Sequence, residues 1–337
     1  MTSLSALFHA PSLFSPSSTC TTTPSRPFFS SKPAASTSSS FMAVSARIAI
    51  VGDVHNDWNL EEDTKALQHL QPDLVLFTGD FGEENAKLVQ SVADLKFPKA
   101  VILGNHDAWY THEFSKKKKD AVQLQLECLG EEHVGYRRLD FPTLKLSIIG
   151  GRPFTCGGER LFRKNLLSAR YGIKDMDGSA MRIYHAASGT PEDHFAIFLG
   201  HNGPTGLGSN IEDICGKDWI PEGGDHGDAD LAQAIARIKE TTKVNVPLVV
   251  FGHMHKELAY GNGLRKMIVV GADNTIYLNG AVVPRVKKIA DERGTKRVFT
   301  LVEILQGRVD KIAEAWVSVS GDTASVEDEH VLYKFGN

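Results

Sequence analysis

Five short runs of aliphatic residues in this chain each end abruptly in a polar residue. The runs cover residues 48–51, 74–77, 100–103, 195–199 and 248–251, and Asp, Asn or His follows each within three positions. Strands that are apolar along their whole length are typical of sheets buried on both faces. The pattern therefore predicts a set of buried strands whose carboxyl ends carry polar side chains.

The first three of these strands alternate with helical patterns. We expect strands at 47–51, 74–78 and 100–103, with helices at 58–70 and 83–95 between them. Asp57 is a candidate N-cap of the first helix, and prolines end both helices. This alternation predicts an α/β fold with a mainly parallel sheet, in which ligands collect at the carboxyl ends of the strands.

The remaining elements are predicted less regularly. We expect helices at 120–129 and 228–239, a partly helical region at 160–188, and strands at 144–149, 195–199 and 247–251. A long Gly- and Asp-rich loop, 202–228, follows a candidate ligand and is interpreted as a lid or rim over the site. Four later strands, at 267–270, 275–278, 298–303 and 309–317, are assigned to a second, antiparallel sheet. The weaker pattern from Ser318 onward predicts loose packing.

Residues 1–45 differ from the rest of the chain. They are rich in Ser, Thr, Pro and Ala and contain no Asp or Glu, since the first acidic residue is Asp53. Such a segment cannot bury a core by itself, and acid-free, Ser-rich composition is typical of an organelle transit peptide. The low Arg content favours chloroplast import, with removal near residues 43–46 and a final location in the stroma. A plain disordered tail is the alternative.

The net charge and the cysteines limit which partners and which compartment are expected. The formal net charge of −4 gives no reason to expect nucleic acid or an anionic membrane as a partner. No apolar run approaches the roughly 20 residues that span a bilayer. The four scattered cysteines contain no CxxC pair, which fits a reducing compartment. The oligomeric state cannot be deduced.

The polar clusters offer oxygen and imidazole donors and no thiolate. They are Asp53-Val54-His55, Gly79-Asp80, Gly104-Asn105-His106-Asp107, Gly200-His201 and Gly252-His253-Met254-His255. This donor set suits Mn²⁺, Fe or Zn²⁺ better than a Zn–Cys site or an all-oxygen Ca²⁺ site. In an extended chain, residues two apart point to the same side, so the Asp53/His55 and His253/His255 pairs can each address one metal cluster.

In this order, the five clusters resemble the calcineurin-like metallophosphoesterase superfamily. The resemblance spans residues 53–255 and implies a four-layer αββα sandwich of two mixed sheets, forming a metallophosphoesterase domain over residues 46–320 with a C-terminal extension at 321–337. It also implies two divalent metal ions, of Mn, Fe or Zn, and a small phosphorylated substrate.

The resemblance implies a role for each matching residue. Asp53, His55 and His255 would hold the first metal, Asp80 would bridge both, and Asn105, His201 and His253 would hold the second. Asn105 would also contact substrate, and His106 would protonate the leaving oxygen. Asp107 would either orient His106 or cap the following segment. The implied reaction is hydrolysis of phosphate mono- or diesters by a hydroxide that the two metals generate.

Two features separate the chain from the protein Ser/Thr phosphatase branch of that superfamily. Phe81-Gly82-Glu83-Glu84 follows Asp80, so an Asp-Arg-Gly element is missing, and Asp107 stands where that branch has Glu. A small-molecule phosphoesterase is therefore favoured over a phosphoprotein phosphatase. Arg152 is a candidate phosphate contact, with a surface turn as the alternative. Asp225, His226 and Asp228 are either rim ligands or, as favoured here, a helix N-cap cluster.

Two further functions compete with a phosphoesterase. A binding or scaffold module on the same fold would be expected to lack ligands or the proton donor, and all of them are present in this chain. A nuclease would share the metal set but would need a basic groove, which the overall charge does not suggest.

Overall fold

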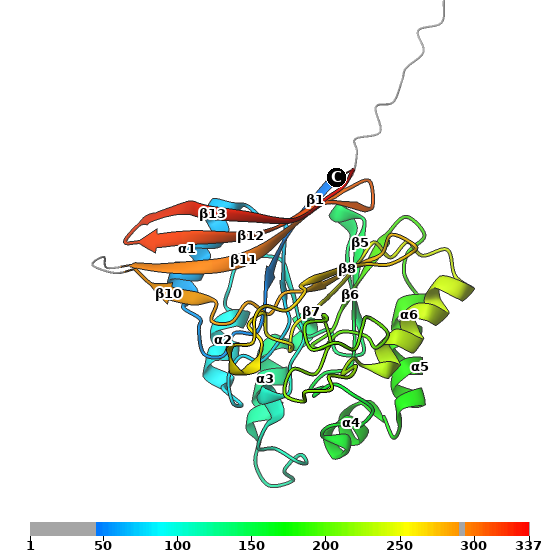
Figure 1. Cartoon of the computed structure of the whole chain (residues 1–337). Coiled ribbons are helices and arrows are strands. Elements are labelled where there is room, and N and C mark those ends of the chain that lie inside the picture. Colours follow the sequence, from blue (N-terminus) through cyan, green and yellow to red (C-terminus); the bar gives the residue numbers. More distant parts are fainter. Residues whose placement is uncertain (1–44, 290–293, 337) are drawn as a thin grey trace, which may run out of the picture. The chain divides into compact units, whose positions relative to one another are not determined.

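The computed structural model describes residues 45–289 and 294–336 (Figure 1). The predicted transit peptide lies outside the described residues except for Ser45, which already belongs to the first strand. The described helices are too short or too polar to span a bilayer.

The strands of the described residues form two mixed sheets. One sheet has the order β13 (Thr323–Lys334), β12 (Arg308–Ser320), β11 (Gly294–Leu305), β1 (Ser45–Val51), β2 (Leu74–Phe77), β3 (Lys99–Val101), and β10 (Val286–Lys288) pairs with β11. The other has the order β4 (Arg138–Phe141), β5 (Leu146–Gly150), β6 (Phe195–Leu199), β7 (Leu248–Phe251), β9 (Ile276–Asn279), β8 (Ile268–Val270). The strands β1-β2-β3 are parallel, as are β5-β6-β7-β9.

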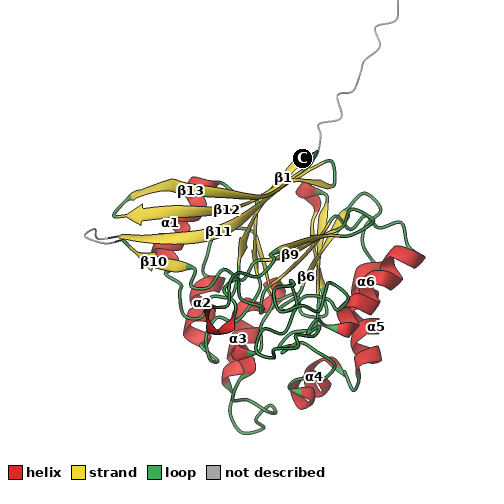
Figure 2. Cartoon of the chain, in the orientation of Figure 1, coloured by secondary structure: helices red, strands yellow, loops and turns green. Residues whose placement is uncertain are grey.

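Within the described residues, six α-helices cover the sheets. They are α1 (Leu60–Leu70), α2 (Ala86–Ala93), α3 (Ala121–Leu129), α4 (Lys164–Tyr171), α5 (Met176–Ser188) and α6 (Ala229–Thr241). Figure 2 shows α5 and α6 on the opposite side of the two sheets from α2 and α3. The expected α/β architecture of helix, sheet, sheet and helix layers is confirmed.

Alternation along the strands builds this layering. Ile48 and Ile50 of β1 lie in a buried core with Ile197 and Leu199 of β6, and this core contains strand and loop residues but no α-helix residue of the described chain. The intervening strand residues, such as Val51, pack instead into the core that the helices share. Because side chains alternate across a strand, each sheet can bury one face against the other sheet and one against helices.

Several predicted boundaries shift. The first helix begins at Leu60, and its N-cap is Asn59 rather than Asp57, since the Asn59 side chain accepts hydrogen bonds from the backbone N–H groups of Glu61 and Glu62. The second helix begins only at Ala86, after Asn85.

The assignment of the later strands to one antiparallel sheet is wrong. β8 and β9 extend the sheet that contains β7, with β9 parallel to it, whereas β11 and β12 continue the first sheet through the antiparallel pairing of β11 with β1. A strand's pattern shows that it has a buried face, but it does not show which sheet edge the strand joins.

The expectation of loose packing after Ser318 is also wrong for the backbone. The residues 323–334 form β13, which pairs with β12 in an antiparallel ladder, and residues 321–322 are the turn between them. Most side chains of β13 are exposed, which explains the weak hydrophobic pattern. As an edge strand, β13 is held by main-chain hydrogen bonds more than by burial.

Candidate metal centre

The predicted polar clusters meet at the carboxyl ends of five strands from both sheets. The loops after β1, β2 and β3 carry Asp53, His55, Asp80, Asn105 and His106, and the loops after β6 and β7 carry His201, His253 and His255. Three overlapping groups of these side chains have donor atoms close enough to share a metal ion: Asp53–His55–His255, His55–Asp80–His106, and Asp80–His201–His253.

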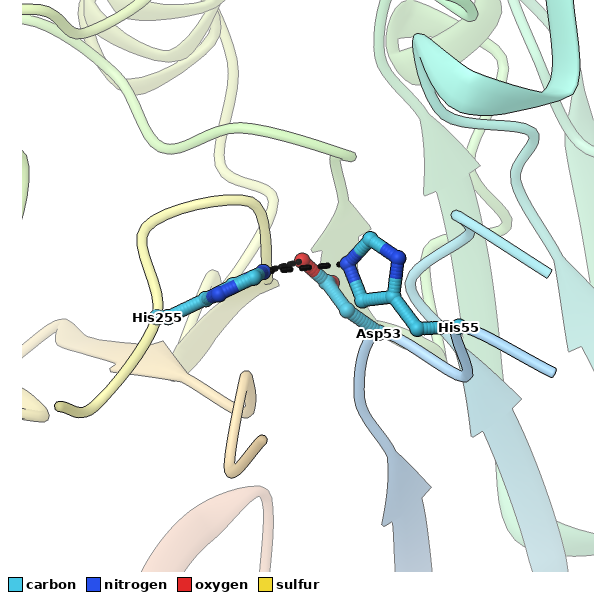
Figure 3. Close-up of side chains that lie close together, drawn as sticks. All are labelled: Asp53, His55 and His255. Atoms are coloured by element: carbon cyan, nitrogen blue, oxygen red, sulfur yellow. Dashed lines mark hydrogen bonds and ion pairs between the residues drawn. The ribbon is translucent and has the colours of Figure 1, made fainter. Parts of the chain in front are cut away.

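The first group has three donors that converge on one point. His55 Nε2 lies 3.0 Å from His255 Nε2, and His255 Nε2 lies 3.5 Å from Asp53 Oδ2 (Figure 3). Two imidazole nitrogens at this distance can share only one proton, so their lone pairs are poorly satisfied by each other. A divalent cation satisfies both nitrogens and the carboxylate, and this donor set therefore fits a metal ion.

The Asp80–His201–His253 group is organised around His201. Its ring is buried, and Nδ1 lies 2.7 Å from the carbonyl oxygen of Thr78, to which it donates a hydrogen bond. That bond directs Nε2 to Asn105 Oδ1 at 2.8 Å and to Asp80 Oδ1 at 3.4 Å. Backbone support of one ring nitrogen while the other faces a donor cluster is the usual arrangement of a metal-binding histidine.

The two carboxylate oxygens of Asp80 point to histidines of different groups. Its Oδ1 lies 3.4 Å from His201 Nε2, and its Oδ2 lies 3.9 Å from His55 Nε2. A carboxylate that bridges two metal ions needs this orientation, with one oxygen for each ion. Two glycines leave room for the carboxylates. A Cβ on Gly104 would lie 2.2 Å from Asp80 Oδ1, and one on Gly252 would lie 2.1 Å from Asp53 Oδ1.

The electrostatics of the cluster call for positive charge. Burial alone would raise the pKa of Asp80, but the charge of His201 and its hydrogen bond outweigh burial and lower the pKa below its usual value. Burial would lower the pKa of His201, but the charge of Asp80 raises it to about 10. Asp53 behaves like Asp80, with a lowered pKa despite burial because His255 and His201 stabilise its charge. Divalent cations meet the same need.

His253 has the opposite shift. Burial, together with the charge of His201, lowers the pKa of His253 to about 3. Its imidazole is therefore neutral at physiological pH, which is the protonation state that binds a metal ion.

Asp107 has a role that the sequence analysis did not foresee. Its buried carboxylate accepts hydrogen bonds from the backbone N–H groups of Gly104 at 2.7 Å, Asp80 at 3.0 Å and Phe81 at 2.9 Å. These bonds tie the loop after β2 to the loop after β3. Both predicted roles are thus replaced: the carboxylate binds neither the His106 ring nor the amides of the short 3₁₀ helix His106–Ala108.

The charge of Asp107 is costly where it lies. Burial and the neighbouring charge of Asp80 raise the pKa of Asp107 well above its usual value, although the amides of Gly104 and Phe81 oppose this. A carboxyl that holds ligand loops in place at such a cost acts as a positioning residue.

His106 lies at the edge of the cluster. Its backbone N–H donates to Asp80 Oδ1 at 2.9 Å, and its ring meets the His55 ring edge-on at a centroid distance of 5.1 Å. The ring also stacks on Trp109, with centroids 4.9 Å apart and planes 9° apart. Arg163 fixes this segment by donating to the carbonyl oxygens of Ala108 and Trp109. The sequence analysis missed Trp109, which its spacing of three residues from His106 could have indicated.

Arg152 does not reach the cluster as a phosphate contact, and it is not a surface residue either. It is 1% exposed, and its guanidinium nitrogens bond to Asp230 Oδ2 at 2.9 Å, Asp228 Oδ1 at 2.7 Å and the carbonyl oxygen of Arg160 at 3.2 Å. Each guanidinium nitrogen is therefore bonded to a protein group. The favoured N-cap role of Asp228 is wrong for its side chain, which binds Arg152 and Thr155 and makes no cap hydrogen bond.

Both predicted ligand pairs reach the candidate metal centre, but not through the extended backbone that the sequence analysis assumed. Asp53 and His55 do share a group, but His253 and His255 belong to different groups. The backbone at His55 and His253 has φ of 43° and 66°, which is left-handed rather than extended. The i, i+2 rule therefore does not apply there, and a pattern of residue types cannot reveal such local turns.

We predict that Asp107→Asn loosens the ligand loops. An amide offers one acceptor oxygen to three backbone donors and turns an N–H₂ group toward at least one of them, which costs about 1–3 kcal/mol. Chemical denaturation should show a loss of unfolding free energy in that range and weaker metal retention. Asp94→Asn, at an exposed helix end, is the control. Unchanged stability and metal retention in Asp107→Asn would refute this role.

Comparisons with known proteins agree with the site. A sequence model of the calcineurin-like phosphoesterase family matches residues 46–257, more than half of the chain. No match is found among curated proteins.

Solved structures are similar at low sequence identity. A dimetal phosphatase from Danio rerio is 9% identical, with 87% of this chain and 99% of that chain covered and a TM-score of 0.49. A conserved predicted phosphoesterase from Streptococcus pneumoniae is 11% identical, with 85% and 98% covered and a TM-score of 0.31. The sulfate thiohydrolase SoxB of Thermus thermophilus, in complex with glycerol, is 11% identical, with 82% and 42% covered and a TM-score of 0.37.

The family match covers every strand end that carries a candidate ligand. The chain therefore belongs to the calcineurin-like phosphoesterase family and is a metal-dependent hydrolase of phosphoester bonds.

Proposed function

We propose that the chain hydrolyses small phosphate esters at a two-metal site, with Asp80 as the shared ligand and His106 as the proton donor. The observation that carries this proposal is the position of Asp80, whose two oxygens face His201 and His55 respectively. Asp53, His55 and His255 would hold one cation, and Asn105, His201 and His253 the other. Two bound divalent cations would supply an activated water nucleophile and would neutralise the phosphate oxygens.

The protein's own residues fix the geometry of the reaction. Asp107 holds the backbone of Asp80 and Gly104, and the Trp109 ring limits rotation of the His106 imidazole. The His106 ring lies beside His55, so a proton on this imidazole is available to a leaving oxygen at the edge of the cluster. Pre-set positions of this kind lower the barrier because little reorganisation is needed during the reaction.

A pocket beside His106 receives the leaving group in this proposal. It has a volume of about 570 Å³ and is lined by His55, Asn56, Gly82, Glu83, Asn85 and His106. We refer to it as the His106 pocket. Its lining is polar, with amide groups and one carboxylate besides the imidazoles. This lining favours an uncharged polar leaving alcohol over a leaving group with a second phosphate, because Glu83 would repel the added negative charge.

The native cations are proposed to be Mn, Fe or Zn. The donors are carboxylate, amide and imidazole, and no thiolate lies in the three groups. First-row divalent metals accept such a mixed oxygen and nitrogen set, whereas Ca²⁺ and Mg²⁺ prefer oxygen alone.

Hydrolysis of model esters by the full chain tests the function. With Mn²⁺ supplied, we expect turnover of p-nitrophenyl phosphate, its bis ester, or both, and loss of this turnover after a chelator removes the metal. Restored turnover on adding Mn²⁺ would exclude irreversible damage by the chelator. Folded, metal-loaded protein that turns over neither ester would contradict the proposal and favour a binding module on this fold.

We predict that His106→Ala reduces kcat on the order of 10²–10⁴-fold while metal content stays unchanged, because general acids contribute about this much. Metal analysis and steady-state kinetics on the same preparation measure both effects. His69→Ala, on an exposed face of α1, serves as the control. Wild-type turnover in His106→Ala would remove the proton-donor role from this residue.

We further propose that residues 1–45 direct the protein to the chloroplast stroma. Support comes from the absence of acidic residues before Asp53 and the Ser-rich composition of the segment. A fusion of residues 1–60 to a fluorescent protein should accumulate in the stroma of plant cells. Cytosolic fluorescence, equal to that of the fluorescent protein alone, would contradict this proposal.

A further inference from the structure

A second pocket adjoins the metal centre away from His106. It has a volume of about 490 Å³, and its lining includes Gly157, Lys217, Trp219, Ile220 and His226. We refer to it as the Trp219 pocket. A smaller hollow of about 240 Å³ is lined by Trp219, His253 and His255 among others, so Trp219 lies between the pocket and candidate ligands of the centre. Neither hollow shares a lining residue with the His106 pocket.

Ring contacts also join the Trp219 pocket to the candidate ligands. The His226 ring stacks near the His253 ring, with centroids 6.1 Å apart and planes 27° apart. Trp219 meets His226 at a centroid distance of 4.8 Å and an angle of 84°. A ligand group that contacts Trp219 and His226 is therefore separated by the His226 ring alone from His253, which is proposed to bind the second metal ion.

The loop that carries Trp219 is firmly held. Arg265 is 4% exposed, and its Nη1 donates to the carbonyl oxygens of Asp213 at 2.7 Å and Gly216 at 2.8 Å. Its Nη2 pairs with Asp218 at 3.0 Å, and Asp218 also accepts from the backbone N–H of Ala259 at 2.8 Å. The residue directly before Trp219 is thus fixed, although 202–228 contains no helix or strand.

Beside its charged residues, the pocket lining includes exposed aromatic and apolar side chains. Trp219 is 44% exposed and the neighbouring Ile220 is 37% exposed, on a loop whose backbone is otherwise well bonded. Large apolar side chains held open at the mouth of a site are typical of ligand contacts. The broad face of an indole best matches a flat, aromatic ligand group.

The charges around the pocket favour an anionic neighbour to that group. Within residues 45–289 and 294–336, neither Lys217 nor Arg160 pairs its side chain with a carboxylate. Of the two acidic lining residues, Asp225 is already occupied by the hydroxyl of Thr205 and the backbone N–H groups of Gly206 and Gly227. Lys217 and Arg160 are therefore cationic lining groups without a carboxylate partner among these residues, and a phosphate oxygen of a bound ligand can pair with them.

We propose that the Trp219 pocket binds an aromatic substituent that stays on the phosphorus after cleavage, which makes the natural substrate a phosphodiester. This inference rests on the proposed function. In that reaction a water oxygen bonds to phosphorus, the bond from phosphorus to the leaving oxygen breaks, and the leaving oxygen takes the proton of His106. The leaving group therefore occupies the His106 pocket. A monoester has no second substituent to fill the Trp219 pocket, whereas a diester does, and its product is an aryl monoester that the flanking cations can hold.

Two diesters with the same leaving group test this proposal on the full chain with Mn²⁺. Phenyl p-nitrophenyl phosphate and methyl p-nitrophenyl phosphate both release p-nitrophenol, but only the former retains an aromatic group. We expect wild-type kcat/KM to favour the phenyl ester by roughly tenfold. Trp219→Ala should lose roughly five- to tenfold on the phenyl ester and less than twofold on the methyl ester, and Trp219→Phe should recover most of the loss.

Controls keep the outcomes distinct. Tyr260→Ala removes an aromatic ring that is 86% exposed and lines neither pocket, and it should change neither rate. Equal losses on both esters in Trp219→Ala, or no phenyl preference in the wild type, would overturn the aromatic subsite while leaving the hydrolase intact. Failure of the wild-type protein to cleave any ester would instead overturn the proposed function and this inference with it.

Discussion

The metal centre of this structure depends on two buried carboxylates, Asp53 and Asp80, at the junction of the two sheets. Both are about 1% exposed, and both keep lowered pKa values because imidazoles surround them. Buried negative charge of this density is costly unless cations balance it. The convergence of imidazole nitrogens on the same points, at distances as short as 3.0 Å, is arranged for metal ions rather than for the side chains alone.

The fold makes this convergence possible because the parallel strands of both sheets end at the same place. The loops after β1, β2 and β3 supply one side of the centre, and those after β6 and β7 supply the other. Hydrogen bonds to backbone atoms fix the loops relative to one another. Asp107 bonds to the loops after β2 and β3, and the Thr78 carbonyl oxygen orients His201. Arg265 holds the 202–228 loop, to which we assign the substrate specificity in our proposal, in place beside the centre.

The sequence predicted the strands, and the candidate ligand residues that the structure brings together, because both depend on local patterns. A buried parallel strand is continuously apolar, and a ligand after it stands out by type. What the sequence could not supply were long-range partners and local turns. Arg152 was separated by more than 75 residues from the carboxylates that bury it, and Asp107 had no sequence feature that distinguished a loop clamp from a catalytic residue. The left-handed backbone at His253 similarly has no signature in residue type.

The proposed function requires that this chain bind two metal ions around Asp80. The most direct test is the divalent metal content per chain of full-length protein, measured by mass spectrometry of the elements after equilibration with Mn²⁺ and removal of free ions. We expect two ions per chain in the wild type and a clear loss of bound metal in Asp80→Asn. A wild-type protein that retains no metal, or an Asp80→Asn protein that retains both ions, would contradict it.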